Sequence, residues 1–579
     1  MITDAPYAYT PITSLLKSNV QELIDALDSS IISFIYTTSN QLEVDTSFFD
    51  AWHQHILVDL TTKLTANFSK YTRPDVTPQL TPELKTALDL LHKHFIITYV
   101  DKSSNDYAFI CRHHYINTIM NELLSPTYDP QHQSYKTIVD SLIKILRDLN
   151  FTPDAANIIL GILYGNLKAH KDPSTFRFIA QGTKTPLKQL SLAINLALKA
   201  ISPHLDTLWQ AAFTDYDAPT QHFQHHCQII NNSAGLRDLI TLFNYEQPHR
   251  PNTHASTHDF STLYTKLEHK AIITHTSTIL ETLFTHIAAY KNTTPGLLRL
   301  KINTTTNSFE WVIQVKSNPK LKPNTFLLTH TLLAKWIEIL ITNTYITHMG
   351  KIFKQIIGIP MGTNCAVHLV DLILFTYEYN YLIKQLIKRK YTRIDELRYT
   401  RRYLDDITTL NNPDYNDYKY KIYPKHMLTL NEESKGLPFH CLDFHIFYNN
   451  DPNPTYNGIC STLHSKRDDP KFKGLLFTRY PDPKSFINQA LLYNTVTTEL
   501  HRYHRIITLR HHFEYQVADF FNYLINKGYN YNKLFKKLHH FIHNHLPFYQ
   551  TQQTNTIIQS IKTHVTRRAL RQQLHFDNE

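Results

Sequence analysis

Hydrophobic and polar residues follow two periods along this chain, and each period predicts one kind of element. Apolar residues three or four positions apart predict helices, and the clearest such stretches are 48–68, 185–201, 267–286, 327–344, 366–384, 488–511, 515–527 and 531–542. Apolar runs rich in β-branched and aromatic residues predict strands, and these cover 95–100, 107–111, 298–303, 309–315, 427–430 and 439–447. Residues 203–250 lack a clean period and predict loops and short helices. Beyond about residue 465 the pattern is helical and basic.

One apolar stretch contains two adjacent acids, in the sequence Tyr403-Leu404-Asp405-Asp406 followed by Ile407. Neighbouring side chains on a strand point to opposite faces, so the pair reaches one site only from a tight turn between two strands. Crowded carboxylates repel each other, and a hard divalent cation such as Mg²⁺ relieves that repulsion. The sequence therefore predicts a hairpin with the acids at its tip, and a solvated acidic turn is the alternative.

A basic loop lies between two short strand-like runs around residues 164–179. It contains Lys168 and Lys171, and Arg177 follows in the second run. A hairpin can align these cations along a triphosphate, and arginine is the natural bidentate partner of a phosphate group. A solvated basic turn is the alternative interpretation.

Two further stretches carry candidate chemistry. Asp259 closes a short predicted strand, and hydroxyl and aromatic residues follow it. Farther along, three of only 12 glycines fall within 350–362, directly before the predicted helix 366–384. Scarce glycine concentrated before a helix indicates that the backbone approaches a ligand closely. The stretch lacks the GxxxxGK[ST] pattern, so it is not a P-loop.

Composition narrows the class of partner. The 579-residue chain has 42% hydrophobic and 19% charged residues, which is typical of a folded protein, and its net charge of +10 favours a polyanion such as nucleic acid. The five cysteines form no CxxC pair, which favours a reducing intracellular setting. A zinc site at residues 225–227 is not expected, because no second ligand pair has the required spacing. The most apolar predicted helices contain charged residues, so no membrane span is expected.

In their order along the chain, these stretches resemble the motifs of reverse transcriptases from the Penelope-like retroelements, which are relatives of telomerase. The resemblance covers roughly residues 90–545. The matching pieces are Asp101-Lys102, the basic loop 165–171 with Arg177-Phe178-Ile179, 259–265, Gln355 to Gly362 with Glu378, Tyr403 to Asp406, Ile422-Tyr423-Pro424, Leu442-Asp443, residues 479–481 and residues 527–529. Asn166 and Phe178 stand where the lineage has prolines. No GIY-YIG endonuclease pattern follows the thumb landmarks.

The resemblance implies an α+β, right-hand polymerase fold with fingers, palm and thumb. Its domains are expected to be a helical N-terminal region at 1–89, fingers with the basic hairpin at 90–245, a palm with catalytic aspartates at 246–464, and a helical basic thumb with a C-terminal tail at 465–579. The implied activity is RNA-directed DNA polymerisation, in which a primer 3′-OH on an RNA template is extended with dNTPs. A DNA product implies nuclear residence.

The resemblance also assigns roles to individual residues. Asp259, Asp405 and Asp406 are expected to be catalytic and to hold two Mg²⁺ ions, with Mn²⁺ as a substitute. The residues expected to bind the nucleotide are Lys168, Lys171, Arg177, Phe260, Tyr264, Gln355 and Gly362. Tyr264 lies where these enzymes have an aromatic gate against the ribose 2′-OH.

The basic helices after residue 465 predict contacts to a nucleic-acid backbone, through Arg502, Arg505 and Lys536, although a solvated helix face is the alternative for each. Two other functions are compatible with the residues. The chain could be a catalytically idle, nucleic-acid-binding relic of a retroelement, which the presence of all three aspartates argues against. It could also be an RNA-dependent RNA polymerase, which Tyr264 argues against.

Overall fold

The structure of this protein is a computed structural model with a mixed α+β fold. It describes residues 46–71, 82–152, 158–169, 171, 173–182, 184–219, 225–247, 254–261, 263–314, 321–360, 362–449, 458–464, 480–481, 483, 489–545 and 555–565, with a few residues between 24 and 35. The chain forms two compact units. The first comprises Met1–Lys102, Asp106–Leu208 and Tyr264–Thr376, and the second comprises Ser103–Asn105, Trp209–Leu263 and Tyr377–Glu579.

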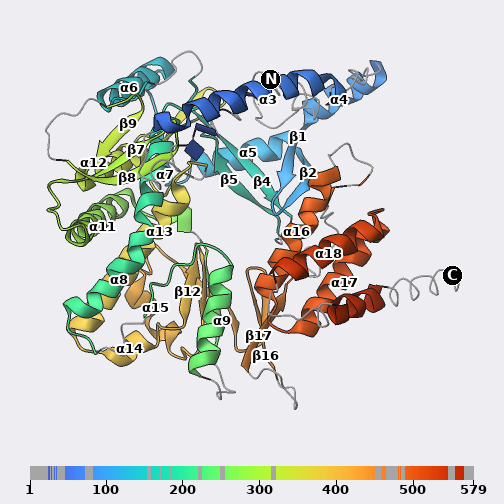
Figure 1. Cartoon of the computed structure of the whole chain (residues 1–579). Helices are drawn as coiled ribbons and strands as arrows, with labels where there is room; N and C mark the ends of the chain where they lie inside the picture. The colour runs from blue at the N-terminus through green and yellow to red at the C-terminus, as the bar shows by residue number, and fades with distance from the viewer. Residues whose placement is uncertain are drawn as a thin grey trace. The chain divides into compact units, whose positions relative to one another are not determined.

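The first unit is built on a seven-stranded sheet (Figure 1). Its strand order is β2-β1-β4-β10-β11-β3, and β5 pairs with β4 beside this path. The strands are β1 (Phe95–Val100), β2 (Ser103–Cys111), β3 (Tyr128–Gln131), β4 (Gly161–Lys168), β5 (Thr175–Ala180), β10 (Tyr345–His348) and β11 (Lys351–Gln355). Apolar side chains of β4, β5, β10 and β11 pack with Tyr115, Ile119 and Leu123 of a covering helix, α5 (Arg112–Leu123).

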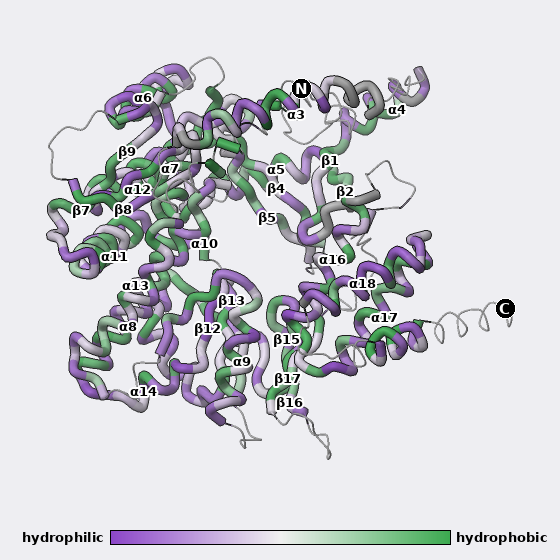
Figure 2. Tube along the Cα trace, in the orientation of Figure 1, coloured by the Kyte–Doolittle hydropathy of each residue, from purple (hydrophilic) through white to green (hydrophobic). Residues whose placement is uncertain are grey.

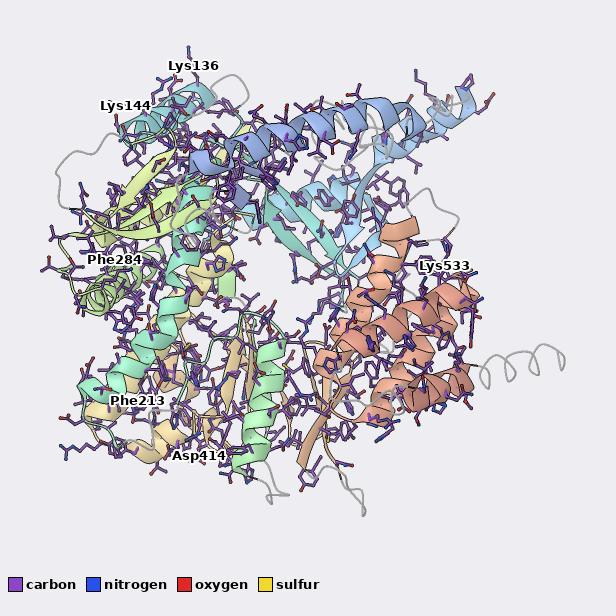
Figure 3. The ribbon with its side chains drawn as sticks, in the orientation of Figure 1. Lys136, Lys144, Phe213, Phe284, Asp414 and Lys533 are labelled. Carbon is purple, nitrogen blue, oxygen red and sulfur yellow. The ribbon has the colours of Figure 1, made fainter. Side chains whose placement is uncertain are left out.

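A smaller sheet of three strands lies in the same unit, in the order β8-β7-β9. Its strands are β7 (Leu298–Asn303), β8 (Ser308–Ile313) and β9 (Thr325–Leu328). Phe284, which Figure 3 labels, is fully buried where a helix meets this sheet. Its ring lies 5.0 Å from the ring of Trp311 and 5.9 Å from that of His330, centroid to centroid. β7 and β8 pair antiparallel from Leu298 to Ile313, which confirms the predicted hairpin over the described residues.

The remaining helices with residues in the first unit are mostly amphipathic. They are α3 (Asp50–Tyr71), α4 (Pro82–His94), α6 (Tyr135–Asp148), α7 (Lys188–Ile201), α8 (Pro203–Asp215), α10 (Leu263–Lys266), α11 (His269–Tyr290), α12 (His330–Thr342) and α13 (Ala366–Ile387). Two of them begin at side-chain caps, because Ser134 accepts a hydrogen bond from the Thr137 N–H and Thr329 accepts one from the Leu332 N–H. The predicted helix after the glycine-rich stretch is α13.

The second unit contains a four-stranded sheet in the order β12-β13-β6-β14 and a three-stranded sheet in the order β15-β16-β17. The strands are β6 (Ser256–Phe260), β12 (Thr400–Tyr403), β13 (Asp406–Thr409), β14 (Leu430–Lys435), β15 (Phe439–Cys441), β16 (Phe444–Asn449) and β17 (Gly458–Leu463). The helices wholly within it are α9 (Ala234–Glu246), α14 (Tyr391–Asp395), α15 (Tyr415–Ile422), α16 (Gln489–Ile506), α17 (Arg510–Asn526), α18 (Tyr531–His545) and a last helix over 555–565. Hydrophobic and hydrophilic residues alternate along α16 to α18 (Figure 2), and their apolar sides join one core with β15 to β17.

Three sequence-based predictions were wrong. The strand predicted at 427–430 begins only at Leu430 and continues through charged residues to Lys435 as β14, an exposed edge strand that pairs with β6. Charged residues on an edge strand hide the apolar alternation that normally reveals a strand. The run 439–447 is two strands instead of one, joined at Leu442-Asp443. Residues 203–250 also contain longer helices than expected, since α8 and α9 each have 13 residues.

Candidate active site

Two of the three predicted catalytic aspartates face each other across paired strands. Asp259 on β6 and Asp406 on β13 are direct partners in an antiparallel pair. Side chains of directly opposed residues lie on the same face with Cβ atoms about 4.5–5.5 Å apart. The four-stranded sheet therefore presents both carboxyl groups to one region. Both residues are half-buried.

Asp405 occupies the turn next to this pair. Tyr403 on β12 pairs with Asp406 on β13, which leaves Leu404 and Asp405 as a two-residue hairpin loop. Leu404 has a φ of 56°, and such tight hairpins need a positive φ at their first loop residue. The Phe260 N–H donates to the Asp405 carbonyl oxygen at 3.2 Å. The predicted hairpin with the acid pair at its tip is thus confirmed, and its backbone is tied to β6.

The His258 side chain lies on the opposite, buried face of this sheet and is uncharged. This histidine lies between Thr257 and Asp259 on β6, and burial, followed by the nearby Lys419 charge, lowers its pKa to about 3. It is therefore neutral at ordinary pH and accepts or donates only a hydrogen bond, to the Ser256 hydroxyl at 2.9 Å. The acids on the other face do not face a cationic histidine from behind.

No three His, Cys, Asp or Glu side chains in the described part of the chain are already gathered closely enough to hold a metal ion. Carboxylates without a cation repel each other and separate. The backbone register nevertheless brings three hard oxygen donors to one edge of the sheet, which is the ligand type that Mg²⁺ prefers. The donor set therefore fits a divalent cation, and rotation of the side chains would complete the site.

The basic hairpin predicted from the sequence is formed by β4 and β5 in the first unit. Their register places Asn166 opposite Arg177 and Lys168 opposite Thr175. The Lys171 N–H donates to the Lys168 carbonyl oxygen at 3.1 Å in the connecting turn. Lys171 is exposed and Lys168 half-buried, so the hairpin presents its cations along one end.

Arg177 has a buried carboxylate as its partner. Its Nε lies 3.3 Å from an Asp101 oxygen, and the side chain of Asp101 is 8% exposed whereas that of Arg177 is 46% exposed. Asp101 follows β1, and its N–H donates to the Leu167 carbonyl oxygen at 2.8 Å. The contact holds the inner edge of the guanidinium and leaves the outer part open to solvent. Sequence reasoning noted Asp101 only as part of a motif.

Neighbouring elements support the same hairpin through Gly165. The Thr98 hydroxyl donates to the Gly165 carbonyl oxygen at 2.7 Å, and the Gly165 N–H donates to the Tyr115 hydroxyl oxygen at 2.8 Å. Asn166 and Phe178 replace prolines expected from the resemblance, but these buried hydrogen bonds hold the hairpin from both sides.

The glycine-rich turn packs against backbone at two glycines. Gly358 has a φ of 86°, and a Cβ there would lie 2.5 Å from the Tyr264 carbonyl oxygen. Gly362 has a φ of 121°, and a Cβ there would lie 2.1 Å from the Ala180 carbonyl oxygen at the end of β5. Glycine is required at both positions by backbone conformation and by space. The concentration of glycine therefore reflects close packing of the chain on itself.

Tyr264, the predicted sugar gate, lies on α10 and is tied to this turn. The Ile359 N–H donates to its carbonyl oxygen at 2.7 Å, and the Gly358 N–H donates to the Leu267 carbonyl oxygen at 2.7 Å. The His269 ring contacts the Gly358 carbonyl oxygen at 3.0 Å. These contacts fix the backbone around Tyr264, whose side chain is half-buried.

Two predicted nucleotide-binding side chains are in the core. Phe260 is 4% exposed, and its ring packs edge-on against the Tyr423 ring at 5.0 Å. Gln355 is also 4% exposed, and its amide nitrogen donates to the Ile357 carbonyl oxygen at 3.0 Å. Both side chains therefore pack within the protein, and a ligand cannot reach them without displacing their neighbours.

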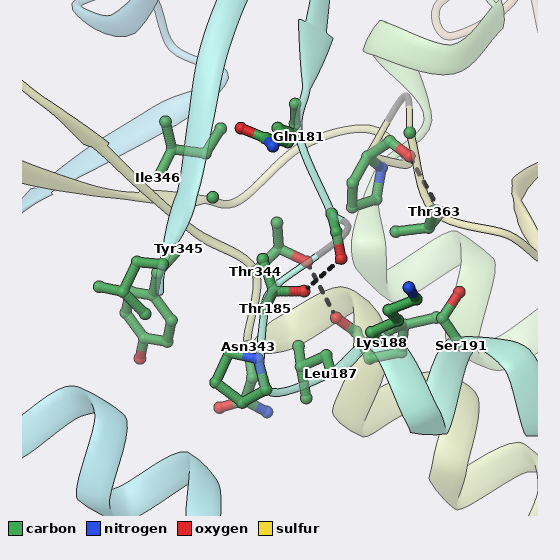
Figure 4. A pocket seen from close by; sticks show the side chains of 18 of the residues that line it. Gln181, Thr185, Leu187, Lys188, Ser191, Asn343, Thr344, Tyr345, Ile346 and Thr363 are labelled. Atoms are coloured by element: carbon green, nitrogen blue, oxygen red, sulfur yellow. Dashed lines mark hydrogen bonds between the residues drawn. The ribbon is translucent and has the colours of Figure 1, made fainter. Parts of the chain in front are cut away.

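The small cavity beside the glycine-rich turn is not a nucleotide site. Figure 4 shows residues that line it, among them Gln181, Thr185, Lys188, Tyr345 and Thr363. Its volume is about 40 Å³, which is room for very few water molecules. A nucleotide would need a pocket of about 300 Å³ or more.

The three predicted nucleic-acid-binding cations differ in their surroundings. Arg502 is bound by Asp443 at 2.9 Å and by Glu499 at 3.1 Å, and its side chain is 17% exposed. Its charge is thereby neutralised within the protein, so a phosphate would have to compete with two carboxylates. Arg505 and Lys536 are exposed.

Lys536 also borders a groove between α18 and the last helix. The groove has a volume of about 450 Å³ and is lined by Lys536, Lys562, His539, His540 and His543 together with apolar residues. The last helix is attached to α17 by the Ser560 hydroxyl, which donates to Glu514 at 2.5 Å. Lys533, on the same helix α18, is labelled at the surface in Figure 3.

Sequence reasoning assigned no role to the residues that hold the acidic turn, although Glu378 belongs to one of the matching motifs. The Arg402 side chain is fully buried and pairs with Glu378 on α13, and its backbone pairs with the segment Gln228–Ile230. The only signal in the sequence was Arg402 itself, a charged residue shortly before the acidic turn. No sequence pattern indicated that Glu378, 24 residues earlier, would be its partner.

Within the described part of the chain, no helix is long and apolar enough to cross a membrane. No protein-family model matches the chain. No curated protein matches it either.

Solved structures do match the chain. It is similar to telomerase from Candida albicans in complex with a TWJ fragment of telomeric RNA, with a TM-score of 0.51 and 11% identity, over 95% of this chain and 86% of that one. Telomerase from Candida tropicalis matches with 12% identity over 90% of this chain and 72% of that chain in the apo structure, at a TM-score of 0.37. The chain therefore shares the fold of the Candida albicans telomerase over most of its length.

Proposed function

We propose that this protein is an RNA-directed DNA polymerase of the reverse-transcriptase superfamily, which extends a primer 3′-OH with dNTPs. The observation that carries the proposal is the pairing of Asp259 with Asp406 across the sheet, with Asp405 at the adjoining turn. The telomerase-like fold supports the same class of reaction. We further propose that the chain derives from the Penelope-like lineage, on the motifs described above.

Asp259 and Asp405 would hold two Mg²⁺ ions, and Asp406 would complete the set of carboxylate ligands. Bound Mg²⁺ supplies activation of the primer hydroxyl and stabilisation of the leaving pyrophosphate. The protein's own contribution is to hold the three acids on one edge of a rigid sheet. A donor set fixed in advance needs little rearrangement during the reaction.

The cations of the basic hairpin would bind the triphosphate of the incoming nucleotide. Arg177 and Lys171 are exposed at that hairpin, and Asp101 leaves the outer nitrogens of Arg177 available. Arginine can contact two phosphate oxygens at once, whereas lysine acts as a point charge. Lys168 is the less exposed third cation.

Tyr264 would select the sugar of the nucleotide. An aromatic ring beside the sugar excludes a ribose 2′-OH by steric overlap, so dNTPs are expected to be preferred. On the resemblance described above, the backbone of Gly362 would border the nucleotide. Arg505 and Lys536 would bind the nucleic-acid backbone, and an RNA template with a DNA primer is the proposed substrate. Synthesis of DNA would place the protein in the nucleus.

Primer extension with purified protein tests this function. The templates would be poly(rA) with an oligo(dT) primer and a DNA template of the same length, each with dNTPs or rNTPs and with Mg²⁺ or Mn²⁺. We expect extension on the RNA template with dNTPs and a divalent cation. Extension only with rNTPs would indicate an RNA polymerase instead. Tight primer–template binding without extension under any condition would indicate an idle relic.

A further inference from the structure

The acidic turn is held by a buried network that no part of the proposed chemistry uses. The Arg402 Nε donates to one Glu378 oxygen at 2.6 Å, and its Nη2 lies 3.4 Å from the other. Its Nη1 donates to the Leu404 carbonyl oxygen at 3.2 Å. One side chain therefore links a helix to the loop residue that directly precedes Asp405.

Arg402 itself cannot move easily. Its N–H donates to the Gln228 carbonyl oxygen at 2.6 Å, and its carbonyl oxygen accepts from the Ile230 N–H at 2.9 Å. Arg402 and Glu378 both have side chains that are 0% exposed. The guanidinium thus contacts the turn from a position that backbone pairing fixes.

A second connection starts from the same carboxylate. The Tyr423 hydroxyl donates to the Glu378 Oε1 at 2.8 Å, and burial followed by the Glu378 charge raises the pKa of Tyr423, so the hydroxyl stays protonated. The Tyr423 ring packs against Phe260, whose N–H donates to the Asp405 carbonyl oxygen. Glu378 is therefore connected to the backbone on both sides of the turn.

The turn needs such support. Leu404 adopts a positive φ without being glycine, a conformation that costs free energy and persists only where the surroundings impose it. Two adjacent carboxylates at the tip also repel each other. A loop under these two stresses relaxes unless neighbouring groups fix it.

Stability alone does not account for the ion pair. Removing two charges from water carries a large free-energy cost, and charge-free replacements of a buried pair are often neutral or stabilising. The distinctive property of this pair is its geometry, since a single arginine contacts both Glu378 and the loop carbonyl.

We propose that Glu378, Arg402, Tyr423 and Phe260 are positioning residues that fix Asp405 relative to Asp259. They act through the backbone of the turn and contact neither metal nor substrate. This inference rests on the proposed function for its kinetic readout. Its second readout is metal binding by the protein alone, which does not require polymerase activity.

The main test replaces both buried charges at once, in an Arg402→Met, Glu378→Leu double variant. The matched control is Arg398→Met, Glu246→Leu, which removes a less buried ion pair of the same unit, between α9 and the segment before β12. Measurements are the thermal unfolding midpoint, primer–template affinity, kcat and KM for dTTP in primer extension, and Mn²⁺ affinity by electron paramagnetic resonance.

We expect the Arg402, Glu378 double variant to fold and to bind primer–template as the wild type does. Its kcat should fall by about 100-fold, because a displacement of about 1 Å in a catalytic group has that effect. Mn²⁺ should bind more weakly to it, and the control should lose neither property. A folded double variant with wild-type kcat and Mn²⁺ affinity would overturn the proposal.

A milder variant keeps the test decisive if the double variant fails to fold. Tyr423→Phe removes a single hydroxyl and should lower kcat by about tenfold, the equivalent of one hydrogen bond to a charged group, with little change in KM. Arg402→Lys retains the charge but cannot contact Glu378 and Leu404 together, so its kcat should also be below that of the wild type. Wild-type kcat and Mn²⁺ binding in both variants would contradict the inference. If wild-type protein has no extension activity, the proposed function fails, while Mn²⁺ affinity still decides the positioning role.

Discussion

The four-stranded sheet with the acids and the basic hairpin of β4 and β5 carry opposite charges and are held in different ways. The acids on β6 and β13 are fixed by strand register, and a fully buried ion pair supports their turn from behind. On the basic hairpin of β4 and β5, Arg177 and Lys171 are exposed and Lys168 is half-buried, and the buried Asp101 carboxylate contacts Arg177. The acidic turn is thus supported by buried contacts, whereas two of the three cations of the hairpin are open to solvent.

This structural difference fits the two tasks proposed above, metal binding by the acids and triphosphate binding by the cations. Metal ligands have to keep a fixed geometry, because a small displacement changes both metal affinity and reaction rate. Groups that grip a triphosphate have to bind it and release pyrophosphate, which long exposed side chains do more easily. Substitutions in the four-stranded sheet should therefore lower kcat strongly, and substitutions in the basic hairpin should mainly raise KM.

The largest effect is expected for Asp405→Asn. This substitution preserves the shape of the side chain and removes one charge from the acid set. Primer extension should fall by about 10³-fold or more, as expected when a main electrostatic contribution is lost. Primer–template affinity, measured by fluorescence anisotropy, should stay close to that of the wild type.

Normal extension by the Asp405→Asn variant would refute the metal assignment. Asp414→Asn is a matched control, because Asp414 lies in the same unit and pairs with Arg393 at 3.1 Å. The control should retain extension activity, since it removes an aspartate charge away from the turn.

The next effect concerns the hairpin. Arg177→Ala should raise the KM for dNTPs by about 10- to 100-fold, because a hydrogen bond to a charged group contributes about 1.5–3 kcal/mol. Steady-state primer extension at several dNTP concentrations measures the change, and kcat should fall less than KM rises. Lys136→Ala, which removes an exposed cation on α6 of the same unit, should change neither value. A loss confined to kcat would remove the distinction between the two regions.

A smaller and more specific effect is expected at Tyr264. Tyr264→Ala should lower the discrimination between dNTPs and rNTPs by about tenfold or somewhat more, the range typical of steric selection in a pocket. Competition between dTTP and UTP in primer extension measures it. Unchanged exclusion of UTP would show that this ring is not the gate.

Sequence pattern predicted the parts of the site that depend on local chain geometry. The acidic hairpin at Leu404-Asp405, the basic hairpin around Lys168 and the helix after Gly362 all formed where expected. Each of these depends on turn chemistry or on a strong hydrophobic period, which neighbouring residues encode. The α+β fold class also followed from the motif order.

The remaining features depend on contacts between distant segments. Phe260 lies directly after Asp259, yet strand alternation turns its ring to the buried face, against Tyr423. Arg502 has the spacing of a surface cation, but Asp443, 59 residues earlier, neutralises it. Charged edge residues concealed β14. No local pattern specifies partners so far apart in the chain, so burial and pairing had to come from the structure.

The smallest predicted effect is at Asp101, whose carboxylate contacts the Arg177 Nε, and it offers the sharpest comparison of the two regions. Asp101→Asn removes the charge that holds the Arg177 Nε but leaves Arg177 present. Because Arg177 is 46% exposed, solvent screens the pair, and such pairs contribute about 0.2–1 kcal/mol. The KM for dNTPs should therefore rise only about twofold to fivefold. Glu310→Gln is the control, since it breaks an exposed ion pair with Lys301 in the same unit.

A double-mutant cycle decides whether Asp101 acts through Arg177. If it does, Asp101→Asn should have no further effect on KM once Arg177 is alanine, because the two changes share one contact. Additive effects on KM would show that Asp101 supports the hairpin by another route. The hairpin would then be held by several layers, as the acidic turn is, and the contrast between the two regions would disappear.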